Sequence, residues 1–149
     1  MNLDKFTTKA QSAVQDAAAL ANRNDSATLE AIHLARTLVD NEQGMITSIL
    51  QRLEAPLAAI REELDRAIAR LPRVSGDGAQ LHPAPNLSRI LAKAEAMPDE
   101  MGDSFVSTEH LLIAILESPD TAAELLKNHG LTAEGVREVL EYVRGGESI

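Results

Sequence analysis

The chain has 149 residues, a formal net charge of −9 at pH 7 and no cysteine. This length suffices for one domain with a single core, and the lack of cysteine excludes disulfide bridges and thiolate metal sites. The acidic excess lies in residues 95–141, where 11 acidic side chains stand against only Lys127 and Arg137, and because such a surface repels phosphate backbones we expect no nucleic-acid partner.

At the start of the chain, Met1–Lys5 lacks the basic region and long apolar run that are typical of a signal peptide. No segment approaches the apolar length of a membrane span. We therefore expect a cytoplasmic protein that does not contact a membrane.

Four helices are predicted in the first half of the chain. The first begins at Thr7, whose hydroxyl suits an N-cap, and ends before Asp25. The second contains the apolar residues of segment 34–39, the third follows Gly44, and the fourth has Pro56 in its first turn.

A linker rich in proline and glycine is predicted over residues 73–85, and four more helices follow it. Ser107 is an evident N-cap for the second of these, and Thr132 for the last. Thr121 and Glu124 have the spacing of a capping box, which would begin the third.

The second half of the chain repeats the first. A shift of 77 positions places Leu29, His33, Leu34, Leu38 and Val39 over Val106, His110, Leu111, Ile115 and Leu116. We therefore predict an all-α protein, a pseudo-twofold bundle of eight helices that forms a single domain over residues 1–149. Its first four-helix repeat would span residues 1–72 and its second residues 86–146.

The apolar run Leu111–Leu116 could by periodicity alone be a strand. Its counterpart in the first repeat has Arg36 and Thr37 at two of the six positions, which leaves apolar pairs at helical spacing, so we predict a helix. Ile113 then lies away from the centre of the apolar stripe. It would either pack against the other repeat, which we favour, or form an exposed binding patch.

Catalytic and metal-binding motifs are missing from the sequence. It contains no glycine-rich phosphate loop, no HExxH and no GxSxG. His33 and His110 occupy equivalent places one turn inside their helices, and we interpret them as structural side chains that cover the helix start, although a functional pair is conceivable. We expect no enzymatic activity, metal or cofactor in this chain.

Several segments together resemble the Clp N-terminal repeat domain. They are Leu3–Gln11, the duplicated histidine-leucine helix at 32–34 and 109–112, and Gly102–Val106. Two further segments, 71–76 and 144–148, are similar to the ClpB-type disaggregase branch of that family.

The resemblance implies a domain that hangs on a hexameric AAA+ ATPase and passes unfolded or aggregated polypeptide to it. ATP and Mg²⁺ would bind in downstream modules. The groove between the repeats would present Thr7, Asp103 and Glu109 as polar groups and Met97 as an adaptable apolar floor. We also include His110 among the candidate substrate-binding residues.

Two residues depart from the family pattern. Lys93 stands where the groove of relatives is apolar, and its aliphatic stem could line the groove while its ammonium group reaches water. Pro98 stands where relatives continue a helix, and it would kink or end the helix near Met97.

Two alternative functions are weighed. The chain could be the N-terminal domain of a protease-coupled unfoldase, where it would dock an adaptor protein. It could also be a free-standing helical protein that associates with itself through the seam between the repeats. A recognition domain in isolation is expected to be monomeric.

Overall fold

The computed structural model describes residues 2–40, 44–74 and 80–145. Within them the prediction of an all-α bundle of eight helices is confirmed, and no strand longer than an isolated bridge occurs. The helices are α1 (Thr8–Arg23), α2 (Ala31–Leu38), α3 (Met45–Arg52), α4 (Leu57–Ala69), α5 (Pro85–Met101), α6 (Thr108–Leu116), α7 (Thr121–Asn128) and α8 (Ala133–Arg144).

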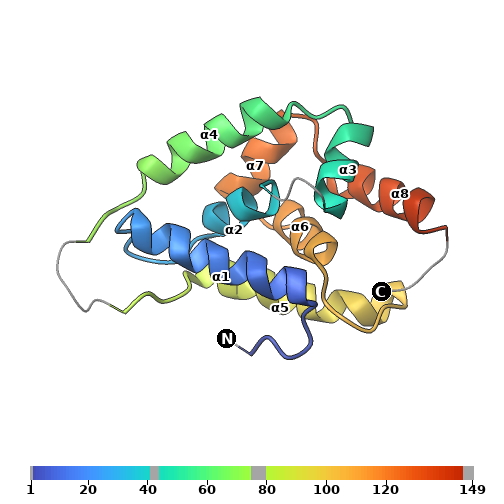
Figure 1. The fold of residues 1–149 in the computed structure, drawn as a ribbon, viewed down its shortest axis with the longest axis horizontal. Helices are drawn as coiled ribbons and strands as arrows, with labels where there is room; N and C mark the ends of the chain where they lie inside the picture. Colours follow the sequence, from blue (N-terminus) through green and yellow to red (C-terminus); the bar gives the residue numbers. More distant parts are fainter. Residues whose placement is uncertain (1, 41–43, 75–79, 146–149) are drawn as a thin grey trace.

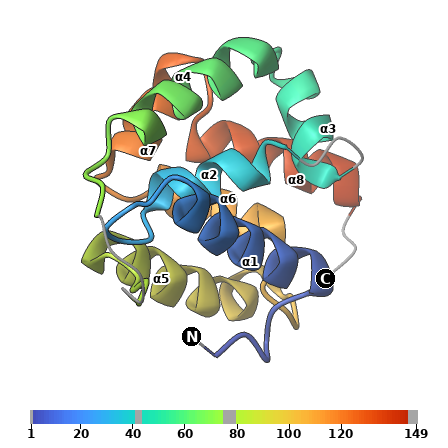
Figure 2. The ribbon, with the colours of Figure 1, turned by 60° about the vertical axis from the view of Figure 1, so that its left-hand side comes forward.

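The helices are arranged around a central pair, α2 and α6 (Figure 1). Helices α1 and α5 run along one side of this pair, and α4 and α7 cover the opposite side (Figures 1 and 2). At one end α3 packs on α8, and elsewhere α4 packs on α7. Each repeat thus completes its packing with a helix of the other repeat, which makes one interleaved domain.

Two isolated bridges display the pseudo-twofold symmetry directly. Phe6 pairs in parallel with Val106, and Leu29 pairs in parallel with Pro83, so that each residue has its counterpart 77 positions away. Their hydrogen bonds repeat as well: Thr7 N–H donates to the Val106 carbonyl, and Ala84 N–H donates to the Leu29 carbonyl, both at 2.8 Å. The segment before each repeat's first helix is therefore held by the other repeat.

Helix α6 is the centre of the core, since all nine of its residues are buried. The run Leu111–Leu116 is helical, as predicted, and it packs against α1, α2, α3, α5, α7 and α8. Ile113 is fully buried, so it packs inside the protein and forms no exposed patch. A helix that is apolar on every side can be stable only when it is surrounded in this way.

Three of the predicted N-caps are confirmed. The hydroxyls of Thr7 and Thr132 accept hydrogen bonds from the Ala10 and Gly135 amides, at 3.1 and 3.0 Å. Ser107 caps α6 and forms a capping box with His110. These side chains accept hydrogen bonds from N–H groups in the first turn, which have no partner within the helix itself.

Two predicted features of helix boundaries are wrong. Asp120, and not Thr121, caps α7, because its carboxylate accepts from the Ala122 amide at 2.8 Å. Helix α5 also does not end near Met97 but continues through Pro98 to Met101. Pro98 is buried, and its carbonyl accepts from the Asp103 amide at 2.7 Å, which closes the last turn of the helix.

The predicted linker is only partly described. Residues 75–79 of the linker, and the predicted end of the second repeat at residue 146, lie outside the described residues. Within the linker, His82–Ala84 is the counterpart of Lys5–Thr7, and α5 begins at Pro85. No helix in the described part of the chain is long and apolar enough to cross a membrane.

Candidate functional site

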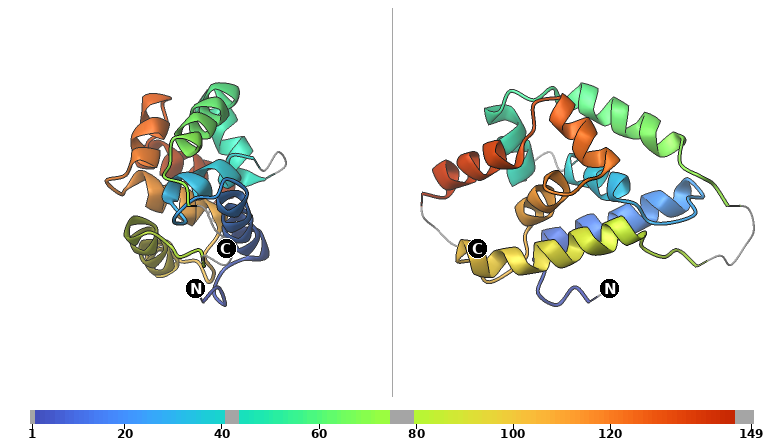
Figure 3. Two further views of the ribbon diagram at one scale, coloured as in Figure 1. Left: turned by 90° about the vertical axis from the view of Figure 1, so that its left-hand side faces the viewer. Right: turned by 180° about the vertical axis from the view of Figure 1, so that it is seen from behind.

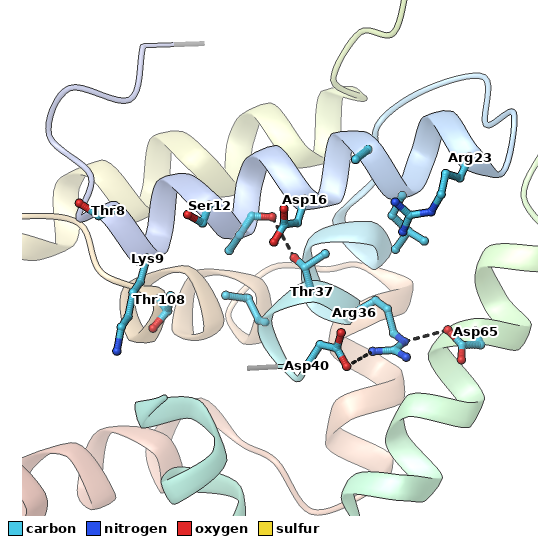
Figure 4. A pocket seen from close by; sticks show the side chains of 14 residues that line it. Thr8, Lys9, Ser12, Asp16, Arg23, Arg36, Thr37, Asp40, Asp65 and Thr108 are labelled. Atoms are coloured by element: carbon cyan, nitrogen blue, oxygen red, sulfur yellow. Dashed lines mark hydrogen bonds and ion pairs between the residues drawn. The ribbon is translucent and has the colours of Figure 1, made fainter. Parts of the chain in front are cut away.

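A cleft of about 530 Å³ runs along one face of α1 (Figure 4). Its walls come from α1, the end of α2, one residue of α4 and the start of α6. We call it the α1 cleft. The residues that line it are Thr8, Lys9, Ser12, Ala13, Asp16, Ala19, Leu20, Arg23, Arg36, Thr37, Leu38, Asp40, Asp65 and Thr108.

The α1 cleft is polar and carries both signs of charge. Arg36 lies on its floor and pairs with Asp40 at 3.1 Å and Asp65 at 2.8 Å (Figure 4). Burial by itself lowers the pKa of Arg36, but the hydrogen bonds to Asp65 and Asp40 outweigh it and hold the pKa above the ordinary value. The cleft therefore keeps a fixed cation, while Lys9 and Ser12 lie toward its other end.

A second feature, a buried ion cluster, lies where the α5–α6 loop meets the end of α8. Asp103 and Glu109 face Arg144, whose Nη1 donates to Asp103 at 3.0 Å and whose Nη2 lies 3.7 Å from Glu109. The Asp103 side chain is fully buried, and those of Glu109 and Arg144 are about nine-tenths buried, at 8% and 11% exposed. Charges this far from water require partners, and Arg144 supplies the positive one.

His110 connects this cluster to the start of α6. Its Nδ1 accepts from the Ser107 amide at 2.8 Å, and its Nε2 donates to Asp103 at 2.8 Å. This pattern requires the neutral ring with the proton on Nε2. Burial lowers the pKa of His110 more than the hydrogen bond to Asp103 raises it, so the ring stays neutral.

The equivalent histidine of the first repeat also accepts a hydrogen bond from the backbone at the start of its helix, but its other partner differs. His33 Nδ1 accepts from the Glu30 amide at 2.9 Å, and Nε2 lies 3.0 Å from the Ser26 hydroxyl. Burial lowers the pKa of His33 too. Both histidines belong to capping boxes, as the structural interpretation predicted. Only the second repeat places a carboxylate against the ring.

The structure brings three of the six predicted site residues together. Asp103, Glu109 and His110 share the buried ion cluster, whereas Met97 is part of the core. Lys93 lies 3.9 Å from Glu117, on another part of the surface. None of the six side chains lines the α1 cleft, and their part in substrate binding stays a prediction.

Thr7 and Glu109 nevertheless each lie next in sequence to a residue that lines the α1 cleft. Their neighbours Thr8 and Thr108 line the cleft. The Thr108 hydroxyl donates to Glu109 at 2.7 Å, so one residue joins the α1 cleft to the buried ion cluster.

Three residues at or near these two features were not predicted as site residues from the sequence. Arg144 and Arg36 become conspicuous only through partners on other helices. Phe105 is half-exposed on the loop that carries Asp103, and one of only two phenylalanines in the chain. Its exposure could not be inferred from apolar spacing, because the loop between α5 and α6, residues 102–107, has no apolar stripe for comparison.

The described residues contain no group of three or more histidine, aspartate or glutamate side chains that could hold a metal ion. The neutral His110 ring lies between the Asp103 carboxylate on Nε2 and the Ser107 amide and hydroxyl on Nδ1, the hydroxyl at 3.0 Å. Ser107 is buried, and its hydroxyl belongs to the capping box of α6. The chemistry that this surface offers is hydrogen bonding and ion pairing.

Comparisons of the sequence identify relatives over the whole chain. The family model of the Clp repeat (R) N-terminal domain matches residues 5–129. The chaperone protein ClpB of Bdellovibrio bacteriovorus is 38% identical over 97% of this chain, and that of Vibrio cholerae is 33% identical over 100%. The chain spans about 17% of the length of each of these two relatives.

Comparisons of the structure give the same fold. The N-terminal domain of Hsp104 from Candida albicans superposes with a TM-score of 0.85 at 19% identity, covering 97% of this chain and 94% of that one. A ClpV N-domain solved in complex with a VipB peptide has a TM-score of 0.75 at 16% identity and covers 99% and 94% of the two chains.

Proposed function

The chain belongs to the Clp repeat N-terminal domain family, as its sequence resemblance predicted, and from this premise we propose that it recognises unfolded polypeptide. The α1 cleft is the observation that carries the proposal. It offers a volume of about 530 Å³ along α1.

The lining of the α1 cleft suits an extended chain. The hydroxyls of Thr8 and Ser12 can each donate and accept hydrogen bonds, as an unpaired backbone requires, and the Thr108 hydroxyl, which donates to Glu109, can still accept. Farther along α1, the partly exposed Leu20 offers apolar contact. Such a surface can bind the backbone and apolar side chains of many polypeptides, without selecting one particular sequence.

Binding to the isolated domain should be weak, on the order of micromolar or poorer, because a small cleft must offset the ordering of a flexible client. Weak binding fits a domain that hands its client onward. In the proposed full-length protein, a hexameric AAA+ disaggregase of the cytoplasm, six domains would gain avidity. ATP and Mg²⁺ would act in modules outside this chain.

The test is an NMR titration of the isolated domain with casein, an unfolded protein, followed by variants. We expect shifts at Thr8, Ser12 and Asp16. Ser12→Arg should fill the cleft and weaken binding at least fivefold. Gln15→Arg, the same kind of change on an exposed part of α1 outside the cleft, should leave binding unchanged.

Two results would overturn the proposal. One is an absence of shifts at casein concentrations up to the millimolar range. The other is a set of shifts confined to α7, on the opposite side of the domain from α1 (Figure 3).

Docking of a specific adaptor peptide is the second candidate function, and the ClpV N-domain solved with a VipB peptide favours it. The two candidates differ in selectivity. A general recognition domain binds casein and other unfolded proteins with similar affinity, whereas an adaptor site discriminates strongly between sequences. Light scattering of the isolated domain tests the third alternative, self-association, which would appear as a mass that rises with concentration.

A further inference from the structure

Arg144 reaches the buried ion cluster from the last turn of α8. It is the final residue of that helix, and Gly145 follows in the left-handed conformation, with φ of 56°. Its guanidinium group crosses to the α5–α6 loop and to α6, 41 residues away along the chain from Asp103. A residue from the end of α8 thus fills an acidic site that the α5–α6 loop and α6 form.

The fit of Arg144 in this site is incomplete. Only Nη1 makes a hydrogen bond, to Asp103, while the buried Nε and Nη2 atoms have no hydrogen-bond partner. The 3.7 Å between Nη2 and Glu109 is an ion pair without a hydrogen bond. A guanidinium group binds carboxylates best through two parallel hydrogen bonds. The site therefore accepts an arginine but does not hold this one in its best geometry.

The last turn of α8 has no buried apolar anchor, so the ion pairs of Arg144 hold it in place. If Arg144 leaves, the buried carboxylates of Asp103 and Glu109 need another cation as partner. The buried residues of α8 are Val136 and Leu140, and both lie before that turn. Between Glu141 and Gly145 no residue is buried. Helix ends with few buried contacts open at low free energy, without unfolding of the domain.

We propose that Arg144 is a built-in competitor for this acidic site, and that an arginine side chain of an unfolded client takes its place between Asp103 and Glu109. The inference rests on the proposed function and adds its regulation. Thr108 links the site to the α1 cleft, so a client lying in the cleft could place an arginine there. The exposed ring of Phe105, on the loop of Asp103, offers apolar contact beside it.

The consequence is a measurable gain of affinity when the competitor is removed. If Arg144 occupies the site for 90–99% of the time, its removal raises the apparent affinity of an arginine-bearing peptide by roughly 10- to 100-fold. Glutamine at this position keeps most of the length and loses the charge. Arg144→Lys keeps the charge without the planar fork, and we expect its gain to be smaller than that of Arg144→Gln.

The experiment measures binding of a fluorescent unfolded peptide with one central arginine to wild type and Arg144→Gln. The matched probe has citrulline, which is neutral and of nearly the same shape, in place of the arginine. We expect at least a tenfold gain for the arginine peptide on Arg144→Gln and less than a twofold change for the citrulline peptide. Equal gains for both peptides, or none, would overturn the proposal.

A second readout uses the unaltered protein, so the test holds even if Arg144→Gln folds poorly. The Nε–H resonance of Arg144 should move toward its solvent-exposed position as the arginine peptide is added. A resonance that stays fixed while the peptide binds would also refute displacement. Casein binding at the α1 cleft without a shift of the Arg144 resonance would refute this inference alone. Loss of all binding would refute the proposed function.

Discussion

Truncation of one equivalent leucine in each repeat compares how much the core packing of α2 and of α6 contributes to the stability of the domain. Leu34 in α2 and Leu111 in α6 are counterparts, and both are buried to within 1%. We expect Leu111→Ala to destabilise the domain more than Leu34→Ala, even though the chemical change is the same.

The magnitude follows from what surrounds each side chain. Leucine-to-alanine changes in protein cores cost about 2.7–5.0 kcal/mol, and the cost grows with the cavity that the neighbours fail to fill. Helix α6 is enclosed by six other helices, whereas α2 carries the half-buried Arg36 and Thr37 on one side and has more freedom to relax. We therefore expect about 4–5 kcal/mol at Leu111 and about 2.5–3.5 kcal/mol at Leu34.

Urea unfolding followed by circular dichroism is the assay, with an m-value unchanged from wild type as the sign of two-state behaviour. For a domain of this size 1 kcal/mol corresponds to roughly 2–4 °C in Tm, so Leu111→Ala should melt about 8–20 °C lower. Val74→Ala, at an exposed apolar position, is the control and should stay within about 0.5 kcal/mol. A cost below about 1 kcal/mol at Leu111, or a larger cost at Leu34, would refute the central role of α6.

Three further predictions follow from the site and the helix ends. Because burial lowers the pKa of His33 and His110, the unfolded chain binds more protons than the folded one below about pH 6.5. The contribution of these rings to the free energy of unfolding should therefore be full above that pH and fall progressively as the pH is lowered from it. Urea titrations across this range should show a smaller fall in His33→Gln and His110→Gln, and an equal fall in these variants would contradict the assignment. Ile113→Arg, which copies the Arg36 of the first repeat, should prevent folding because position 113 is fully buried, and a soluble variant with a wild-type spectrum would show that the site can open. Gly102→Ala should cost about 1 kcal/mol in thermal unfolding, since φ is +73° there although no atom would clash with the new methyl group, and no measurable loss would mean that the turn relaxes.

The sequence by itself determined the helices and their duplication. Apolar spacing and N-cap residues such as Thr7, Ser107 and Thr132 act within a few residues of chain, so the pattern of letters contains their physical cause. The comparison between repeats resolved the apolar run of α6, because Arg36 and Thr37 exclude a buried strand at the same positions.

The sequence did not predict two helix ends correctly, because neighbouring residues at each end favoured different boundaries. Asp120 and Thr121 are adjacent N-cap candidates, and the backbone geometry that chose Asp120 depends on how α7 meets its neighbours. Pro98 likewise remains helical because it is buried and because its carbonyl finds the Asp103 amide.

The candidate site was predictable only in its local part. Asp103, Glu109 and His110 lie within eight residues of one another on a loop and the start of one helix, which is why the sequence could group them. Tertiary structure alone brought Arg144 to the same carboxylates and built the α1 cleft from four separate helices. Hydrogen bonds between near neighbours are specified by the chain, whereas the partner of a buried charge is settled by packing, which the sequence pattern does not record.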